Sequence, residues 1–453
     1  MKEHFKGLKN LKLKECSFSV NLRGVCLFSK RVGLNFIAFS FAIGMSFVQA
    51  EEGNPNTFCS EKTPTYELDL EGAVTRALSH SEKLHIANHE LQSKGYQARQ
   101  ARLYPNPIFS YEVENFAGSN DWDGWNSREE RYIWSQLWET AGKRSLRTQA
   151  ATHQYYASLV GYDVSKLILL NRLYRAFIQV AAAQELLALS QDLRETAGEV
   201  LRVATKKVEA GKVSIMQQNK GEVAFSTALI QLERAQAELK NAKKRLSLLW
   251  AAPCPDFEKV TFPLYDIFPP ISLDECVSDL CNQAEIVQSH HHTCRSEKAW
   301  HLEKAGKVPD VILEVGYKAN YEEDNQSLIA GISFPIPLFN RNEGNIGRAY
   351  YDMLKIENEG RELRLVLESK LAIIHEELTS SYRVAERFKN YSLPAAEKSF
   401  KMARRGYRKG KFEYLDVLDS QRTLFEVKAS YIQALVNYHT KRADIDFLNS
   451  QMD

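Results

Sequence analysis

The stretch from Gly142 to about Lys207 contains no proline and is rich in helix-forming residues, and it constrains the fold more than any other feature. At 1.5 Å per residue, a helix of this length extends roughly 100 Å. Its apolar residues recur at a spacing typical of a seam between packed helices: Leu159, Tyr162, Leu167, Leu170, Leu173, Phe177, Val180 and Leu187. Because an ordinary globular domain has no place for so long a rod, we expect one elongated, mostly helical body.

Glycine-lysine pairs interrupt helical patterns at two places in the chain, Gly211-Lys212 and Gly410-Lys411. We interpret both pairs as the tips of helical hairpins, because glycine accepts the backbone conformation that ends a helix. The segments Val213 to Trp250 and Glu413 to Leu448 then return as partner helices. The two tips indicate that the chain is built twice.

The rest of the sequence follows the same twofold plan. A helix from Leu68 to Leu103 corresponds to a second helix from Leu273 to Lys304, and each is followed by a proline turn. The second long helix is expected from about Glu343 to Tyr407, with a bend at Pro394. We therefore predict a first repeat at residues 68–251, a proline-rich connector at 252–272 and a second repeat at 273–453.

Each predicted repeat contains two segments in which apolar and polar residues alternate, as in β-strands that have one apolar face. Phe109, Tyr111 and Val113 share one face of the first segment, for example. The four predicted strands cover about residues 107–117, 129–139, 309–321 and 327–338. Pairs of such strands joined by polar loops are typical of a transmembrane hairpin in an outer-membrane barrel, and a soluble hairpin is the alternative.

The N-terminus has the layout of a signal peptide at residues 1–50: a basic region, an apolar run from Phe36 to Val48, and the small-residue site that ends at Ala50. A membrane anchor is the alternative, but the apolar run is shorter than the roughly 20 residues that span a bilayer. Residues 51–67 are then an irregular mature N-terminus. Export leaves five cysteines in an oxidising compartment, and their pairing is open: Cys59, Cys254, Cys276, Cys281 and Cys294.

The charge composition favours neither nucleic acid nor acidic lipid as a general partner, because the 453 residues carry a net charge of only +2. Four amphipathic strands also cannot close a membrane barrel alone, since the smallest such barrels use eight strands. Open strand edges in hydrocarbon would leave amides without hydrogen bonds. We therefore expect several copies of the chain to share one barrel, with their long helices packed into a hollow cylinder.

This arrangement resembles the TolC-like outer-membrane efflux proteins over about residues 68–448. The segment Gly406 to Tyr438, GYRKGKFEYLDVLDSQRTLFEVKASYIQALVNY, is similar to the family's tip motif, and ARLYPNPIFSYEVENFAGS with WETAGKR is similar to its CzcC-like heavy-metal branch. The resemblance implies a homotrimer with a trimeric α-barrel and a 12-stranded transmembrane β-barrel shared by three chains. It also implies an outer-membrane location, with the helices in the periplasm. The implied partners are a periplasmic adaptor (membrane fusion) protein and an inner-membrane RND-type pump. The resemblance implies neither a cofactor nor enzymatic activity.

The tip motif also implies site residues. Asp416 and Asp419 match aspartates that ring the narrow periplasmic entrance of the pore, and the alternative is a pair of helix-start acids. The first repeat has Gln217 and Lys220 at the corresponding places. Tyr407 matches a gate tyrosine, with an exposed tip tyrosine as the alternative, and Phe412 stands where a basic gate residue is common. The expected adaptor-facing tips are Gly211, Lys212, Gly410 and Lys411.

Three residues of the motif His290-His291-His292-Thr293-Cys294 are candidate metal ligands, namely His290, His292 and Cys294. Consecutive histidines point in different directions around a helix, so we favour a solvated helix face and predict no metal site there. No constellation of nucleophile and base is recognisable.

The leading functional hypothesis is a passive exit duct for heavy-metal cations or small toxic compounds. The alternatives are a duct for type I protein secretion and a periplasmic coiled-coil scaffold without a pore.

Overall fold

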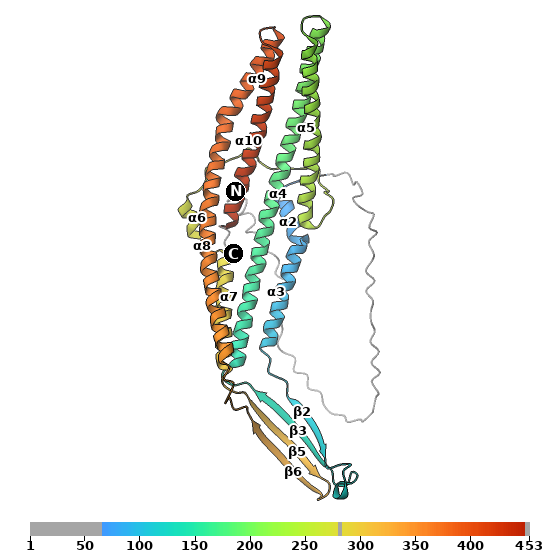
Figure 1. The fold of residues 1–453 in the computed structure, drawn as a ribbon, viewed down its shortest axis with the longest axis vertical. Helices are drawn as coiled ribbons and strands as arrows, with labels where there is room; N and C mark the ends of the chain where they lie inside the picture. The colour runs from blue at the N-terminus through green and yellow to red at the C-terminus, as the bar shows by residue number, and fades with distance from the viewer. Residues whose placement is uncertain (1–65, 280–282, 449–453) are drawn as a thin grey trace. The chain divides into compact units, whose positions relative to one another are not determined.

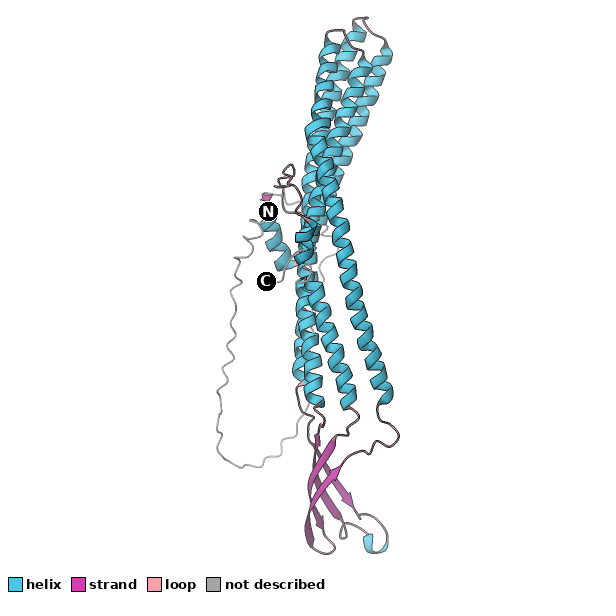
Figure 2. Cartoon of the chain, turned by 90° about the vertical axis from the view of Figure 1, so that its left-hand side faces the viewer, coloured by secondary structure: helices cyan, strands magenta, loops and turns pink. Residues whose placement is uncertain are grey.

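The computed structural model describes residues 66–279 and 283–448, which all belong to one unit, Cys59–Asp453. The predicted signal peptide, the mature N-terminus up to residue 65, Cys59 and Cys281 lie outside the described residues. Two helical hairpins dominate the unit, and the strands lie at the opposite end of the long helices from the hairpin turns (Figures 1 and 2). Among the described helices, none combines the length and apolarity needed to cross a bilayer.

The first hairpin consists of α4 (Lys143–Glu209) and α5 (Ile215–Ser247), which ends in the short 3-10 turn η2 (Leu248–Trp250). Gly211 has a φ of 66°, in the left-handed region that favours glycine. Its N–H donates to the carbonyl of Val208 at 2.8 Å, and the N–H of Lys212 donates to Lys207 at 2.9 Å. These two bonds form a Schellman cap, which satisfies carbonyls at the end of α4 and reverses the chain.

The second hairpin has the same cap. Gly410 has a φ of 71°, and the N–H of Lys411 donates to the carbonyl of Gly406 at 2.9 Å. The hairpin is formed by α9 (Leu393–Arg408) and α10 (Tyr414–Leu448). Both predicted helix reversals are therefore confirmed.

The predicted bend in the second long helix is a single turn of π-helix. α8 (Glu343–Arg387) leads into η4 (Phe388–Ser392), and α9 follows with Pro394 in its first turn. Proline has no N–H to donate to the preceding turn, and its ring crowds the carbonyl four residues earlier. A widened turn at this position accommodates both effects.

The prediction of one continuous helix from Leu68 to Leu103 is wrong. β1 (Glu67–Leu68) precedes α2 (Leu70–His80), and Ser81, whose ψ of 115° is extended, separates α2 from α3 (Glu82–Ala101). β1 pairs in parallel with β4 (Lys259–Val260), inside the proline-rich connector. A two-residue strand has no alternation to recognise, so the sequence did not predict this pairing. The segment predicted as a helix from Leu273 to Lys304 contains α6 (Leu273–Asp279) and α7 (Ala284–Ala305).

Four antiparallel strands form a sheet in the order β2-β3-β5-β6. Their bounds are Ile108–Glu114, Glu129–Trp138, Val311–Asn320 and Asn325–Ser333, and the 3-10 turn η1 (Asn120–Trp122) lies between β2 and β3. β6 ends earlier than the alternation suggested, because Pro335 and Pro337 cannot donate to a neighbouring strand.

Candidate functional site

The tips of the two hairpins pack against each other through a cluster of apolar side chains, here called the tip cluster. It joins the end of α4 to α9 and α10 and contains Val200, Ala204, Ala403, Tyr407, Tyr414 and Val417. The residues that the family motif marks are therefore held by side chains from both hairpins.

Tyr407 is buried in the tip cluster, with 5% of its surface exposed, so the alternative of an exposed tip tyrosine is wrong. Its ring centroid lies 5.6 Å from that of Tyr414, and the Lys207 ammonium lies 3.5 Å from the ring centroid. Lys207 also donates to the Tyr407 carbonyl at 3.1 Å. Burial raises the pKa of Tyr407. The pKa of Tyr414 is raised to about 12, mainly by burial and in smaller part by the electrostatic effect of Tyr407. Both tyrosines are thus neutral at physiological pH.

Glu199 forms a second connection between the hairpins. Its carboxylate on α4 accepts from the guanidinium groups of Arg404 and Arg408 on α9. Because Arg404 and Arg408 are four residues apart, both side chains reach the same face of α4. Sequence reasoning missed Glu199, since nothing in the local pattern relates it to residues 205 and 209 positions later.

Phe412, where the family commonly has a basic residue, folds back over Gly406. A Cβ atom at Gly406 would lie 1.9 Å from the nearest ring carbon of Phe412. Phe412 therefore covers the last turn of α9 by contact with a glycine. A cation from the other hairpin, Lys207, lies beside the Tyr407 ring.

Asp416 and Asp419 are both exposed, one turn apart near the start of α10. Asp416 Oδ2 accepts the N–H of Glu413 at 2.9 Å, the hydrogen bond of a helix cap. The helix-start alternative therefore describes part of what Asp416 does, while both aspartates remain exposed.

The sheet has one face covered with exposed apolar and aromatic side chains. Pairing brings Phe109 opposite Trp134 and Trp134 opposite Val315, so the apolar positions of neighbouring strands coincide. The exposed members of this apolar face are Phe109, Tyr111, Tyr132, Trp134, Trp138, Leu313, Val315, Tyr317, Leu328 and Ile332. On the opposite face Arg131 pairs with Glu114 at 3.0 Å and Lys318 with Glu129 at 2.5 Å.

The family model described as outer membrane efflux protein matches residues 73–252 and 278–449, most of the chain. The chain belongs to the outer membrane efflux protein family. It is 29% identical over 417 residues to the cobalt-zinc-cadmium resistance protein CzcC of Cupriavidus metallidurans, covering 91% of this chain and 96% of that protein.

Solved structures share the fold of this efflux protein. The Campylobacter jejuni CmeC outer membrane channel has a TM-score of 0.71 at 15% identity and covers 84% of this chain and 85% of that chain. VceC of Vibrio cholerae has a TM-score of 0.71 at 16% identity, with 85% and 97% covered. The efflux protein is therefore an outer-membrane channel with its helical part in the periplasm, in a family of channels rather than enzymes.

The candidate metal ligands of the efflux protein lie on α7. His290 Nε2 is 3.5 Å from Cys294 Sγ, and Cys294 is a free thiol, whereas Cys254 is disulfide-bonded. Within residues 66–279 and 283–448, no group of three or more His, Cys, Asp or Glu is arranged to hold a metal ion.

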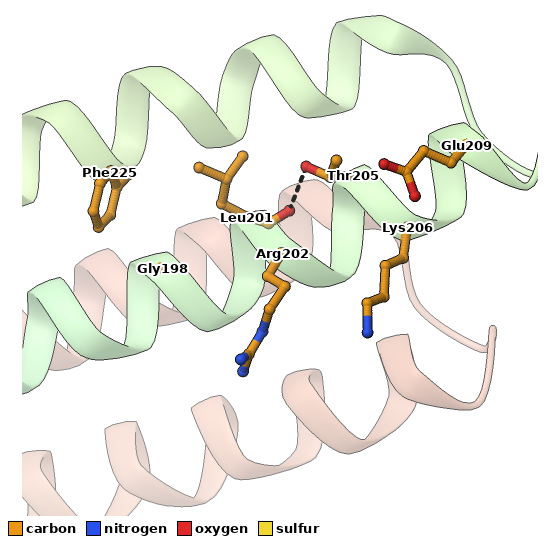
Figure 3. Close-up of a pocket in the computed structure, with 7 residues that line it drawn as sticks. All are labelled: Gly198, Leu201, Arg202, Thr205, Lys206, Glu209 and Phe225. Atoms are coloured by element: carbon orange, nitrogen blue, oxygen red, sulfur yellow. Dashed lines mark hydrogen bonds between the residues drawn. The ribbon is translucent and has the colours of Figure 1, made fainter.

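A cleft of about 420 Å³ lies between α4 and α5 near the first tip of the efflux protein (Figure 3). Arg202 and Lys206 extend to the same side of α4, and Thr205 Oγ1 donates to the Leu201 carbonyl at 3.1 Å. Glu209 also lines the cleft. The lining of the cleft therefore combines two cationic residues with one acid.

Proposed function

We propose that three copies of this efflux protein form the exit duct of a tripartite efflux system, through which heavy-metal cations or small toxic compounds leave the cell passively. A periplasmic adaptor and an inner-membrane RND-type pump complete the system. The duct performs no chemistry of its own. The exposed apolar face of the four-stranded sheet is the observation that carries the proposal.

The sheet supports assembly through its edges as well as its face. β2 and β6 are the edge strands of the described sheet, so each presents backbone groups that need partners in hydrocarbon. Pairing β6 of one copy with β2 of the next satisfies these groups and closes the sheet after three copies. The result is a barrel of 12 strands, within the size range of outer-membrane barrels.

The exposed acids of α10 support an entrance that prefers cations. Threefold copies of Asp416 and Asp419 would place a ring of carboxylates at the periplasmic end, which attracts cations. Tyr407, held between Lys207 and Tyr414, would fix the closed position of the same tip. Gly211, Lys212, Gly410 and Lys411 then form the turns that face the adaptor.

Metal ions are the proposed cargo because the relative CzcC is named for resistance to cobalt, zinc and cadmium. A strain that lacks its own duct but keeps the adaptor and pump tests this point. The efflux protein should restore growth on Co²⁺, Zn²⁺ or Cd²⁺, and restoration of drug tolerance alone would assign small organic compounds instead.

Planar bilayers test the duct itself. The mature protein should conduct with a preference for cations, and Asp416→Asn together with Asp419→Asn should lower that preference several-fold, because the ring loses its charge. Glu222→Gln, a neutralised acid on α5, is the matched control and should keep the wild-type selectivity. Absence of conductance would overturn the duct, whereas unchanged selectivity in the double variant would overturn only the acidic ring.

A further inference from the structure

Two histidines that are distant in sequence meet where α4 packs against α7 (Figure 1). His153 Nδ1 lies 3.5 Å from His291 Nδ1, with ring centroids 5.8 Å apart. Both side chains are half-buried, and the ring of Tyr156 lies beside His291 with centroids 5.5 Å apart. The sequence motif of three histidines did not indicate this pair, because His153 belongs to the other repeat.

The separation of the two nitrogens suits a shared metal ion better than a direct hydrogen bond. Hydrogen bonds from a nitrogen donor are usually 2.7–3.2 Å long. Two nitrogen ligands at about 2.0–2.1 Å from one tetrahedral ion are about 3.4 Å apart. The observed 3.5 Å is therefore close to the spacing that a bound ion requires.

The surrounding contacts hold the two helices in this register. One turn from the pair, Gln288 Nε2 on α7 donates to the Ala157 carbonyl on α4 at 3.1 Å. Gly161 lets that amide approach, because a Cβ atom there would lie 2.6 Å from Gln288 Nε2.

We propose that His153 and His291 form a two-histidine clip that binds a divalent transition-metal ion of the zinc, nickel or copper class across α4 and α7. Imidazole nitrogens are preferred ligands of these ions. Water completes the coordination, since the two rings supply only two ligands. Occupancy of the clip joins the first repeat to the second, independently of what passes through the duct.

Zn²⁺ titration of the purified full-length mature protein in detergent, without an affinity tag, tests the clip. Cys294→Ser serves as the reference, because it removes the adjacent His290–Cys294 pair as a competing ligand set. The reference should bind one Zn²⁺ per chain by calorimetry, with a raised thermal midpoint. Adding His153→Gln and His291→Gln should weaken binding at least tenfold, and each single substitution should produce most of that loss.

The matched control adds His290→Gln and His292→Gln to the same reference, which removes two histidines from α7 but leaves the clip. This control should bind Zn²⁺ as the reference does. Loss of binding in the control, or unchanged binding in the His153 and His291 variants, would overturn the clip. Because the titration involves no transport, its outcome does not depend on the proposed function.

Discussion

Glycine is required at position 406 because the Phe412 side chain covers it, and not because of its backbone conformation. The Phe412 ring occupies the space that a Cβ atom would need. Gly406→Ala should therefore displace the ring and lower stability by about 1–2 kcal/mol, even though alanine favours helix. Gly347→Ala on α8, where a Cβ atom meets nothing within 4 Å, should leave stability unchanged or raise it.

Thermal unfolding followed by circular dichroism measures the stability of both alanine variants. In a Phe412→Ala background the effect of Gly406→Ala should disappear, because the displaced group is gone. A penalty of the same size in both backgrounds would show that Phe412 is not its cause.

His439 makes the stability of the bundle depend on pH. It is buried on α10, its Nε2 lies 2.8 Å from the Leu264 carbonyl, and burial lowers its pKa from 6.5 to about 4. Between pH 6.5 and pH 4 the unfolded chain binds a proton that the folded chain does not, so stability falls as pH falls.

On lowering the pH from 7 to 5, the wild type should lose about 2 kcal/mol more stability than His439→Gln, as measured by thermal midpoints at the two pH values. His85→Gln, exposed on α3, should behave as the wild type does. Equal pH dependence in all three proteins would contradict this assignment.

Sequence patterns predicted single residues well where the reason for them is local. Gly211 and Gly410 end helices through their own backbone conformation, so their function was recognisable from neighbouring residues. Glu199 and His153 were missed because their partners lie on other helices. Phe412 was recognised only as a departure from the family motif, since its contact with Gly406 requires the turn between them to be folded.

Among the contacts between elements, Asp310 joins the start of β5 to the start of α4. Its Oδ1 accepts from the N–H of Thr140 at 2.9 Å and from Lys143 Nζ at 2.8 Å, just before α4 and at its first residue. Asp310→Ala should destabilise the protein by about 2 kcal/mol, because both donors lose a charged acceptor.

Urea midpoints in detergent measure this loss. Asp352→Ala, which removes an exposed pair with Arg348 on α8, should cost less than about 0.5 kcal/mol. If the two variants were equally destabilised, Asp310 would be no more than a surface ion pair.

The long helices, both hairpins and the four strands were predictable, because each has a repeated pattern that spans many residues. The boundaries of these elements were less predictable. The break at Ser81 depends on an extended backbone at one serine. The pairing of β1 with β4 joins two dipeptides that are distant in sequence, with Glu67 opposite Lys259, 192 residues later. The end of β6 follows from prolines already visible in the sequence.

As a whole molecule, a single chain of this protein is incomplete in a membrane. A four-stranded sheet with an exposed apolar face and two edge strands has no stable arrangement in a bilayer until its edges are paired. The sequence pattern predicted that requirement, whereas the number of copies comes from the family resemblance and from the size of the barrel that three sheets would form.

Native mass spectrometry of the mature protein, released from detergent micelles, tests whether three chains share one barrel. The proposed shared barrel predicts one dominant species with three times the mass of the single chain. A monomer, or a complex with any other number of chains, would contradict it.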